Sequence, residues 1–300
     1  MKKITLKKIT LLLLLPILLL IIFSSCNESE ALPTFKISGI PDQNISELAR
    51  RYSEFTDYLS EELDVKVEYL PTTDYSATVT SFSQSNTHMG WFGGLTGVQA
   101  RIAVPGSTAI AQRARDEEFH SVFIFNSDYE GCKDCADGRP GLEDLKGFPF
   151  AFGSESSTSG HLMPRHFLME NGMDPETFFE GLPIFSGSHD KTWAMVQSGA
   201  VYAGALSEAV WEKAVENGKV DTSKVQVFYT TPPYYDYNWT IRADADEIFG
   251  KGFTEKVSAV IIGIDDKALL DLFSANKFIS SNNSNYEQIE GVARGIGIIE

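Results

Sequence analysis

The chain has 300 residues and a formal net charge of −16 at pH 7. Its hydrophobic content of 43% and charged content of 22% are typical of a folded protein and exclude a disordered chain. The acidic excess argues against nucleic acid or an anionic membrane surface as a partner. Any anion that the protein binds must therefore be held by local hydrogen-bond donors.

The N-terminus has the pattern of a targeting segment. A lysine-rich start precedes an apolar run, Leu11–Phe23, which is shorter than the roughly 18 residues expected of a membrane span. The run ends in Phe23-Ser24-Ser25-Cys26, which resembles the lipid-attachment sequence of bacterial lipoproteins. We expect a lipoprotein signal peptide over 1–25, a lipid such as palmitate on Cys26 and a polar tether over 26–33.

The two other cysteines, Cys132 and Cys135, lie close together in a polar, glycine-bearing stretch. In an exported protein such a pair is most often a small disulfide in a surface loop. A redox Cys-x-x-Cys pair and half of a metal site are the alternatives. No second cysteine pair and no histidine pair with zinc-ligand spacing follows, so we expect no metal.

The first third of the chain alternates between strand and helix patterns. Such an alternation predicts a parallel sheet with a binding site at the carboxyl ends of its strands. Strands are expected at Thr34–Ile40, Val65–Leu70 and Met89–Phe92, and helices from Asn44 to Leu63, at Tyr75–Phe82 and at Val98–Val104.

A second α/β set follows, and the chain then returns. Two α/β halves joined by two crossings are typical of a hinged binding protein that holds its ligand in a cleft. We expect one lobe over 34–118 and 236–300 and the other over 119–235. Strands are expected at Ala109–Gln112, His120–Asn126, Phe148–Phe152, Pro183–Phe185, Ala200–Leu206, Val225–Tyr229 and Asn238–Arg242, and helices at Gly160–Asn171, Asp190–Ser198, Glu208–Asn217, Thr254–Ile262 and Ala268–Phe273.

A hydroxyl-rich turn connects the strand at Phe148–Phe152 to the helix after it. Ser154 and Ser156–Ser159 lie where the first helical turn leaves its N–H groups unpaired. These N–H groups, the helix dipole and the hydroxyls could together form an anion pocket. The alternative is an ordinary Ser/Thr N-cap, but four hydroxyls in Ser156–Ser159 are more than a cap requires.

A Ser-dependent hydrolase is a competing hypothesis, because Ser159, His189 and Asp190 are the residue types of a nucleophilic triad. However, the chain has no Gly-x-Ser-x-Gly segment, and a histidine next to its aspartate does not easily place the carboxylate behind the imidazole. No phosphate-binding loop, dinucleotide fingerprint or zinc motif occurs. We therefore expect neither catalysis nor a cofactor.

Several short segments carry a resemblance to a known family. They are Gly39-Ile40-Pro41-Asp42-Gln43-Asn44, Thr73-Asp74-Tyr75, Gly90-Trp91-Phe92-Gly93-Gly94, Ser156-Ser157-Thr158-Ser159-Gly160, Gly187-Ser188-His189-Asp190 and Pro232-Pro233-Tyr234. In these segments the chain resembles the substrate-binding lipoproteins of bacterial ABC importers for phosphonate, phosphite and phosphate, and most of all a subgroup named for selenate binding. The resemblance covers nearly all of the chain after the signal peptide.

The resemblance implies a two-lobed periplasmic-binding-protein type II fold with two crossover strands. It also implies a monomer, lipid-anchored to a bacterial membrane in the periplasm or at the cell surface, that delivers a small oxyanion to a permease and ATPase. A lipid-anchored sensor without transport would have the same binding chemistry and stays open as an alternative.

By the family pattern, Tyr75 lines the cleft, Ser156, Ser157, Thr158 and Ser159 bind the oxyanion, and His189 donates a further hydrogen bond. Trp91 would form the cleft wall with the glycines after it. Glu208 lies near the position of a carboxylate in phosphonate binders, although the local match is loose. Each residue has a plainer alternative: core packing for Tyr75 and Trp91, and helix capping for His189.

The ligand class depends on protons. Phosphonate, phosphite and phosphate can carry a proton at neutral pH, and a carboxylate can accept a hydrogen bond from it, whereas selenate and sulfate are fully ionised and would be repelled. Glu155, Asp190 and Glu208 are the candidate carboxylates. We favour phosphonate or phosphite over selenate, and we expect Glu208→Gln to weaken only the protonated class.

Overall fold

The computed structural model describes residues 33–129 and 139–300. The predicted signal peptide, the tether up to Leu32, the lipid site at Cys26 and the cysteine pair Cys132 and Cys135 lie outside the described residues. None of the described helices combines the length and the apolar character needed to span a membrane.

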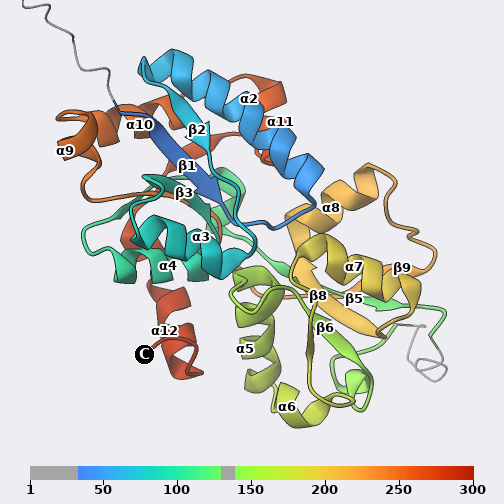
Figure 1. The fold of residues 1–300 in the computed structure, drawn as a ribbon. Helices are drawn as coiled ribbons and strands as arrows, with labels where there is room; N and C mark the ends of the chain where they lie inside the picture. Colours follow the sequence, from blue (N-terminus) through green and yellow to red (C-terminus); the bar gives the residue numbers. More distant parts are fainter. Residues whose placement is uncertain (1–32, 130–138) are drawn as a thin grey trace, which may run out of the picture. The chain divides into compact units, whose positions relative to one another are not determined.

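The first sheet has six strands in the order β11-β4-β10-β3-β1-β2 (Figure 1). β1 pairs in parallel with β2 and β3, whereas β10 is antiparallel to both β3 and β4. The predicted parallel arrangement therefore holds for β1–β3, and a late strand inserts antiparallel before β4. The strands are β1 Phe35–Gly39, β2 Val67–Tyr69, β3 Met89–Phe92, β4 Thr108–Arg113, β10 Asn238–Ile241 and β11 Phe278–Ser280.

The second sheet has five strands in the order β7-β6-β8-β5-β9. β6 is parallel to β7 and β8, and β5 inserts antiparallel between β8 and β9. In each sheet, the inserted antiparallel strand is the one that arrives from the other lobe. The strands are β5 Ser121–Asn126, β6 Phe150–Phe152, β7 Ile184–Phe185, β8 Ala203–Ser207 and β9 Val225–Thr230.

The expected two-lobed α/β fold with two crossings is confirmed, and most expected helices are present. The C-terminal part was missed: β11, α9 and the last helix α12 were not predicted. The helices are α2 Ile45–Leu63, α3 Tyr75–Ser83, α4 Gly94–Ala103, α5 Met163–Glu170, α6 Pro175–Phe178, α7 His189–Ser198, α8 Glu208–Glu216, α9 Ala245–Phe249, α10 Phe253–Ile262, α11 Lys267–Leu272 and α12 Glu287–Gly295, with a π-helix, η4, at Thr158–Leu162 and a short 3-10 helix, η1, at Ala114–Glu117.

The two crossings run side by side. Phe119 and Tyr234 exchange backbone hydrogen bonds of 2.9 and 3.0 Å, and the Asp236 N–H donates to the Asp116 carbonyl at 3.2 Å. Because both crossings connect the two sheets, these bonds hold the two crossing segments together where the chain passes between the lobes. They also place Asp236 between the lobes.

Candidate functional site

Four helix N-termini meet between the two sheets. Helices α3 and α4 come from the first lobe, and η4 and α7 come from the second. The Leu95 N–H on α4 donates to Thr158 Oγ1 at 3.0 Å, and the His189 N–H on α7 donates to the carbonyl of Asp42 at 3.2 Å. Since each contact joins one lobe to the other, the described structure is closed around this point.

The hydroxyl-rich turn begins η4, as expected. Ser157 is the N-cap, and its Oγ accepts the Gly160 N–H at 2.9 Å. The capping alternative therefore accounts for Ser157 alone. Thr158 and Ser159 are each 1% exposed, and their amide N–H groups have no acceptor among the described residues. Ser156 is half-buried and lies 3.2 Å, Oγ to Oγ, from Ser76 of the first lobe.

Tyr75, the first residue of α3, is 1% exposed, and its hydroxyl has no hydrogen-bond partner among the described residues. Burial raises the pKa of this phenol well above its usual value. Ser157 lies close enough to oppose that rise, but the two hydroxyls do not reach hydrogen-bond geometry. A buried, unpartnered donor of this kind is costly to fold, which favours a ligand as its missing acceptor.

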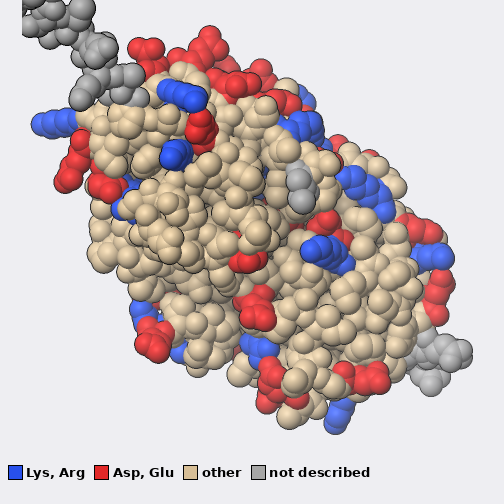
Figure 2. Space-filling model, in the orientation of Figure 1, with Lys and Arg blue, Asp and Glu red and all other residues tan. Residues whose placement is uncertain are grey.

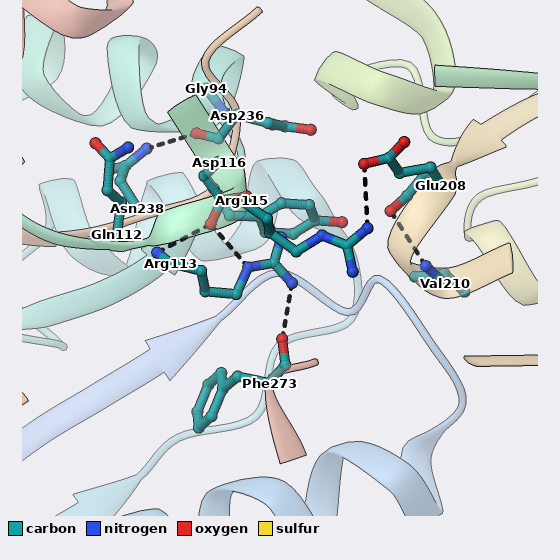
Figure 3. A network of polar contacts seen from close by, with 12 residues as sticks. Gly94, Gln112, Arg113, Arg115, Asp116, Glu208, Val210, Asp236, Asn238 and Phe273 are labelled. Atoms are coloured by element: carbon teal, nitrogen blue, oxygen red, sulfur yellow. Dashed lines mark hydrogen bonds and ion pairs between the residues drawn. The ribbon is translucent and has the colours of Figure 1, made fainter. Parts of the chain in front are cut away.

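Asp236 is a candidate site residue that sequence reasoning missed. Its Oδ1 accepts the Gly94 N–H at 2.9 Å (Figure 3), whereas Oδ2 is buried and has no partner among the described residues. Burial raises the pKa of this carboxyl to about 7. A Cβ on Gly93 would lie 3.0 Å from Thr158 Oγ1 and 3.2 Å from Asp236 Oδ1, so this carboxylate faces the start of η4.

The other buried aspartates each have an arginine partner. Asp42 pairs with Arg51 at 3.3 Å, and Asp116 pairs with Arg113 at 2.6 Å (Figure 3). Both pairs are almost fully buried. Asp236 makes no ion pair with any described residue. The raised pKa of Asp236 therefore follows from burial without a compensating cation.

His189 is 1% exposed and forms hydrogen bonds with residues of both lobes. Its Nδ1 accepts the Ser207 N–H at 3.3 Å, so the proton is on Nε2, which lies 3.3 Å from the Tyr237 hydroxyl. Burial lowers the pKa of this imidazole to about 4, so it is neutral at physiological pH.

The contacts of His189 also exclude the triad. Nδ1 is taken by the Ser207 amide, and Asp190 accepts a hydrogen bond from Ser188 Oγ at 2.6 Å. Among the described residues, no carboxylate orients the imidazole toward Ser159, as a Ser-dependent hydrolase would need. In the part of the chain that the structure describes, no group of acidic, histidine or cysteine side chains could hold a metal ion either.

Glu208 and Trp91 have partners within the protein, unlike the Tyr75 hydroxyl and Asp236 Oδ2. Glu208 is paired with Arg115 at 3.1 Å (Figure 3), and Arg115 also contacts Glu212 at 2.8 Å. Trp91 is 1% exposed and stacks on Tyr237 at 5.5 Å between ring centroids, so it belongs to the core behind the site. Of the other candidate carboxylates, Glu155 is exposed and Asp190 is bonded to Ser188.

A separate groove of about 1010 Å³ runs between α2 and the start of α7. Its walls include Asn44, Tyr69, Ser188 and Asp190, but none of Tyr75, Ser157–Ser159 and Asp236. The acidic and basic side chains on the face in Figure 2 are interspersed, with broad uncharged areas between them. The groove has polar groups of its own, including Asn44 and Lys191, but the unpartnered Tyr75 hydroxyl and Asp236 Oδ2 lie outside its walls. Because a buried polar group without a partner is costly, we place the candidate site at these two oxygens rather than in the groove.

The neutral imidazole of His189 predicts a loss of stability in acid. In the unfolded chain a histidine has a pKa of about 6.5, whereas the folded His189 has a pKa of about 4. As pH falls from about 6.5 toward 4, the unfolded chain therefore takes up a proton that the folded protein does not, and the free energy of unfolding decreases. Because glutamine does not titrate, the free energy of unfolding of His189→Gln should rise by roughly 2 to 4 kcal/mol relative to that of wild type between pH 7 and pH 4. Urea unfolding of both proteins at several pH values measures this; a difference that does not change with pH would contradict it.

Comparisons with known proteins give the following matches. A family described as "ABC transporter, phosphonate, periplasmic substrate-binding protein" matches residues 37–286. The chain is 43% identical over 269 residues to a probable phosphite-binding protein of an ABC transporter from Prochlorococcus marinus (strain MIT 9301), covering 88% of this chain and 90% of the relative. It is 26% identical over 191 residues to a phosphate-import protein of Mycolicibacterium smegmatis, covering 61% of this chain and 57% of that protein.

Two solved structures extend the likeness. The methylphosphonate complex of PhnD1 from Prochlorococcus marinus has a TM-score of 0.83 and 42% identity, covering 89% of this chain and 99% of the other. A binding-protein component of an ABC phosphonate transporter from Pseudomonas aeruginosa has a TM-score of 0.75 at 18% identity, covering 87% and 85%, respectively. At that identity the second match shows a shared fold.

Proposed function

Because this chain belongs to the family of periplasmic substrate-binding proteins of phosphonate ABC transporters, we propose that it captures methylphosphonate or phosphite between its lobes and delivers it to the permease. The family is a solute-binding one and not a family of enzymes. The observation that carries the ligand proposal is the pair of buried, unpartnered oxygens, the Tyr75 hydroxyl and Asp236 Oδ2, next to the start of η4.

The oxyanion is held mainly by neutral donors. The donor set consists of the Tyr75 hydroxyl, the hydroxyls of Ser156–Ser159 and the free amides of Thr158 and Ser159. The Nε2–H of His189, which lies 3.3 Å from the Tyr237 hydroxyl, would join this set by turning from that hydroxyl to the anion. Hydrogen bonds to a charged oxygen contribute about 1.5 to 3 kcal/mol each, so a few of them can hold an anion without a lysine or arginine. The helix dipole of η4 adds to this attraction. Trp91 supports the site from behind Tyr237.

Asp236 takes the carboxylate role that the sequence suggested for Glu208. Its carboxyl and the oxyanion share one proton, so the site prefers an anion that carries a proton at neutral pH. A fully ionised anion such as selenate or sulfate would require the proton to stay on Asp236. The near-complete burial of the donor set favours a small ligand, since a long substituent would have to keep the lobes apart.

The remaining features follow from the sequence. Cys26 carries the lipid that anchors the protein to the membrane after removal of 1–25, and Cys132 and Cys135 form a disulfide in a surface loop. The protein acts as a monomer with lobes over 34–118 with 236–300 and over 119–235. The membership of β1–β4, β10 and β11 in one sheet and β5–β9 in the other supports these boundaries.

Tyr75→Phe tests the proposed site. We expect the affinity for methylphosphonate to fall about tenfold to a hundredfold, because one donor to the anion is lost. The unliganded protein should be as stable as wild type or more stable, since the variant removes an unpartnered buried hydroxyl. Isothermal calorimetry measures the first change and urea unfolding the second.

Tyr202→Phe is the matched control. The Tyr202 hydroxyl is also buried and without a partner among the described residues, but its ring lies among Tyr129 and Phe148 in the second lobe. It should leave the affinity unchanged. Equal affinity losses in the two variants, or none in Tyr75→Phe, would contradict the assignment of Tyr75.

A further inference from the structure

The helix that holds the proposed ligand begins with an irregular turn. Residues Thr158–Leu162 form a π-helix, in which the Leu162 N–H donates to the Ser157 carbonyl at 2.9 Å and the Met163 N–H donates to Thr158. Regular α-helical bonds begin only at Met163. Such wide turns are rare in proteins, so we expect a residue in the sequence that prevents a regular α-helical turn here.

Pro164 provides that cause. In a regular α-helix its nitrogen would donate to the carbonyl of Gly160, four residues earlier, but proline has no N–H and its ring collides with that carbonyl. In the structure the Gly160 carbonyl instead accepts the Gly153 N–H, from the end of β6, at 2.7 Å. The carbonyl is therefore turned away from the helix and toward the sheet.

The space around Gly160 leaves no room for a side chain. A Cβ on Gly160 would lie 3.0 Å from the Cα of Gly153 and 3.1 Å from the Cε1 of His189. A Cβ on Gly153 would lie 3.1 Å from the Cα of Gly160. The backbone of the wide turn thus packs directly on the residue that follows strand β6 and on the His189 ring, so a shift of the turn would require both to adjust.

The wide turn sets the direction of the proposed ligand donors. The amides of Thr158 and Ser159 would lack intrahelical acceptors at the start of any helix, and they have no acceptor among the described residues. The wide turn determines where these amides lie, beside Thr158 Oγ1, which accepts the Leu95 N–H of the first lobe at 3.0 Å. We propose that Pro164 is a positioning residue for ligand binding: by preventing a regular α-helical turn, it directs the Thr158 and Ser159 amides into the cleft. This inference rests on the proposed function.

Pro164→Ala separates positioning from stability. Alanine restores the N–H and is a far better helix former than proline, so the unliganded protein should melt within about 3 °C of wild type or higher. The affinity for methylphosphonate should fall about tenfold or more, because the turn can rewind and the amides leave the cleft. Calorimetry and thermal unfolding of the same preparations measure the two effects.

Pro175→Ala is the matched control, because Pro175 is likewise buried in the first turn of a helix, α6. It should leave the affinity unchanged. Wild-type affinity in Pro164→Ala, or an affinity loss in both variants that merely follows a lower melting temperature, would overturn the inference while the proposed function stands. A wild-type protein that binds none of methylphosphonate, phosphite and phosphate would overturn both.

Gly153→Ala keeps the test decisive if Pro164→Ala does not fold. This variant retains the proline but pushes a methyl group against Gly160 from the strand side. It should also weaken methylphosphonate binding about tenfold or more. Wild-type affinity in a folded Gly153→Ala protein would show that the position of the turn does not matter, and would overturn the inference.

Discussion

Asp236→Asn is expected to weaken methylphosphonate binding about a hundredfold at pH 7, while sulfate binding stays the same or becomes tighter. The asparagine keeps an oxygen for the Gly94 N–H but replaces the proton-sharing oxygen by an NH₂ group. A protonated oxyanion then loses its acceptor, whereas a fully ionised anion gains a donor. A hundredfold change corresponds to about 2.7 kcal/mol, within the range of a hydrogen bond to a charged group.

The pH dependence gives the same prediction a second readout. The carboxyl of Asp236 has a pKa of about 7 in the free protein, and a phosphate monoester loses its second proton near pH 6. Above pH 7 both partners are ionised, so binding must take up a proton, and the wild-type affinity should fall by as much as tenfold per pH unit. In Asp236→Asn this carboxyl is absent, so the affinity should fall less steeply with pH, by the part that the titration of Asp236 contributes.

Glu208→Gln and Asp190→Asn are the matched controls. Both remove a carboxylate charge in the second lobe, but Glu208 is paired with Arg115 and Asp190 with Ser188. Neither should change the ratio of methylphosphonate to sulfate affinity more than about twofold. If Glu208→Gln changed this ratio and Asp236→Asn did not, Glu208 would be the carboxylate of the site and the proposal for Asp236 would be wrong.

Arg113→Met is expected to lower the free energy of unfolding by about 3 to 5 kcal/mol. Arg113 donates to Asp116 through Nε at 2.7 Å and Nη2 at 2.6 Å, and through Nη1 to the Phe273 carbonyl at 2.7 Å (Figure 3). The variant therefore leaves Asp116 buried without its cation and Phe273 without a donor. Urea unfolding at pH 7 measures the loss.

The penalty should become smaller in acid. Once unpaired, the buried Asp116 has a folded pKa above its unfolded value, so the folded variant gains stability as pH falls and the carboxyl takes up its proton. Arg294→Met is the surface control: its ion pair with Glu290 is about 40% exposed, and its loss should cost less than about 1 kcal/mol. A similarly small cost for Arg113→Met would show that the buried pair contributes little.

Most of the architecture could be predicted because the local patterns agree with it. The bounds expected for β3 match the structure, and those for α3 differ by one residue, since buried strands and capped helices have clear period and end signals. The C-terminal elements were missed for different reasons. β11 has only three residues, too few for a clear strand pattern. In contrast, the apolar residues Ile289, Val292 and Ala293 have helical spacing, so α12 could have been predicted.

The candidate site could be predicted only in part. The hydroxyl-rich turn is local, and so its position at a helix start was visible. We expected a regular helix there and not a π-helix, although Pro164 indicates that a regular α-helical turn cannot form before it. The sequence suggested Glu208 as the carboxylate, whereas we propose Asp236, because the partners that distinguish the two are distant in the chain. Arg115 pairs with Glu208 from 93 residues away, and the Gly94 N–H that donates to Asp236 is 142 residues away.

A crystal structure of the mature protein with methylphosphonate tests the central claim most directly. The account predicts one anion between the lobes, with its oxygens within hydrogen-bond distance of the Tyr75 hydroxyl, the Thr158 and Ser159 amides and Asp236 Oδ2. An anion bound instead in the groove beside Asn44 and Asp190, with Tyr75 and Asp236 still unpartnered, would contradict it.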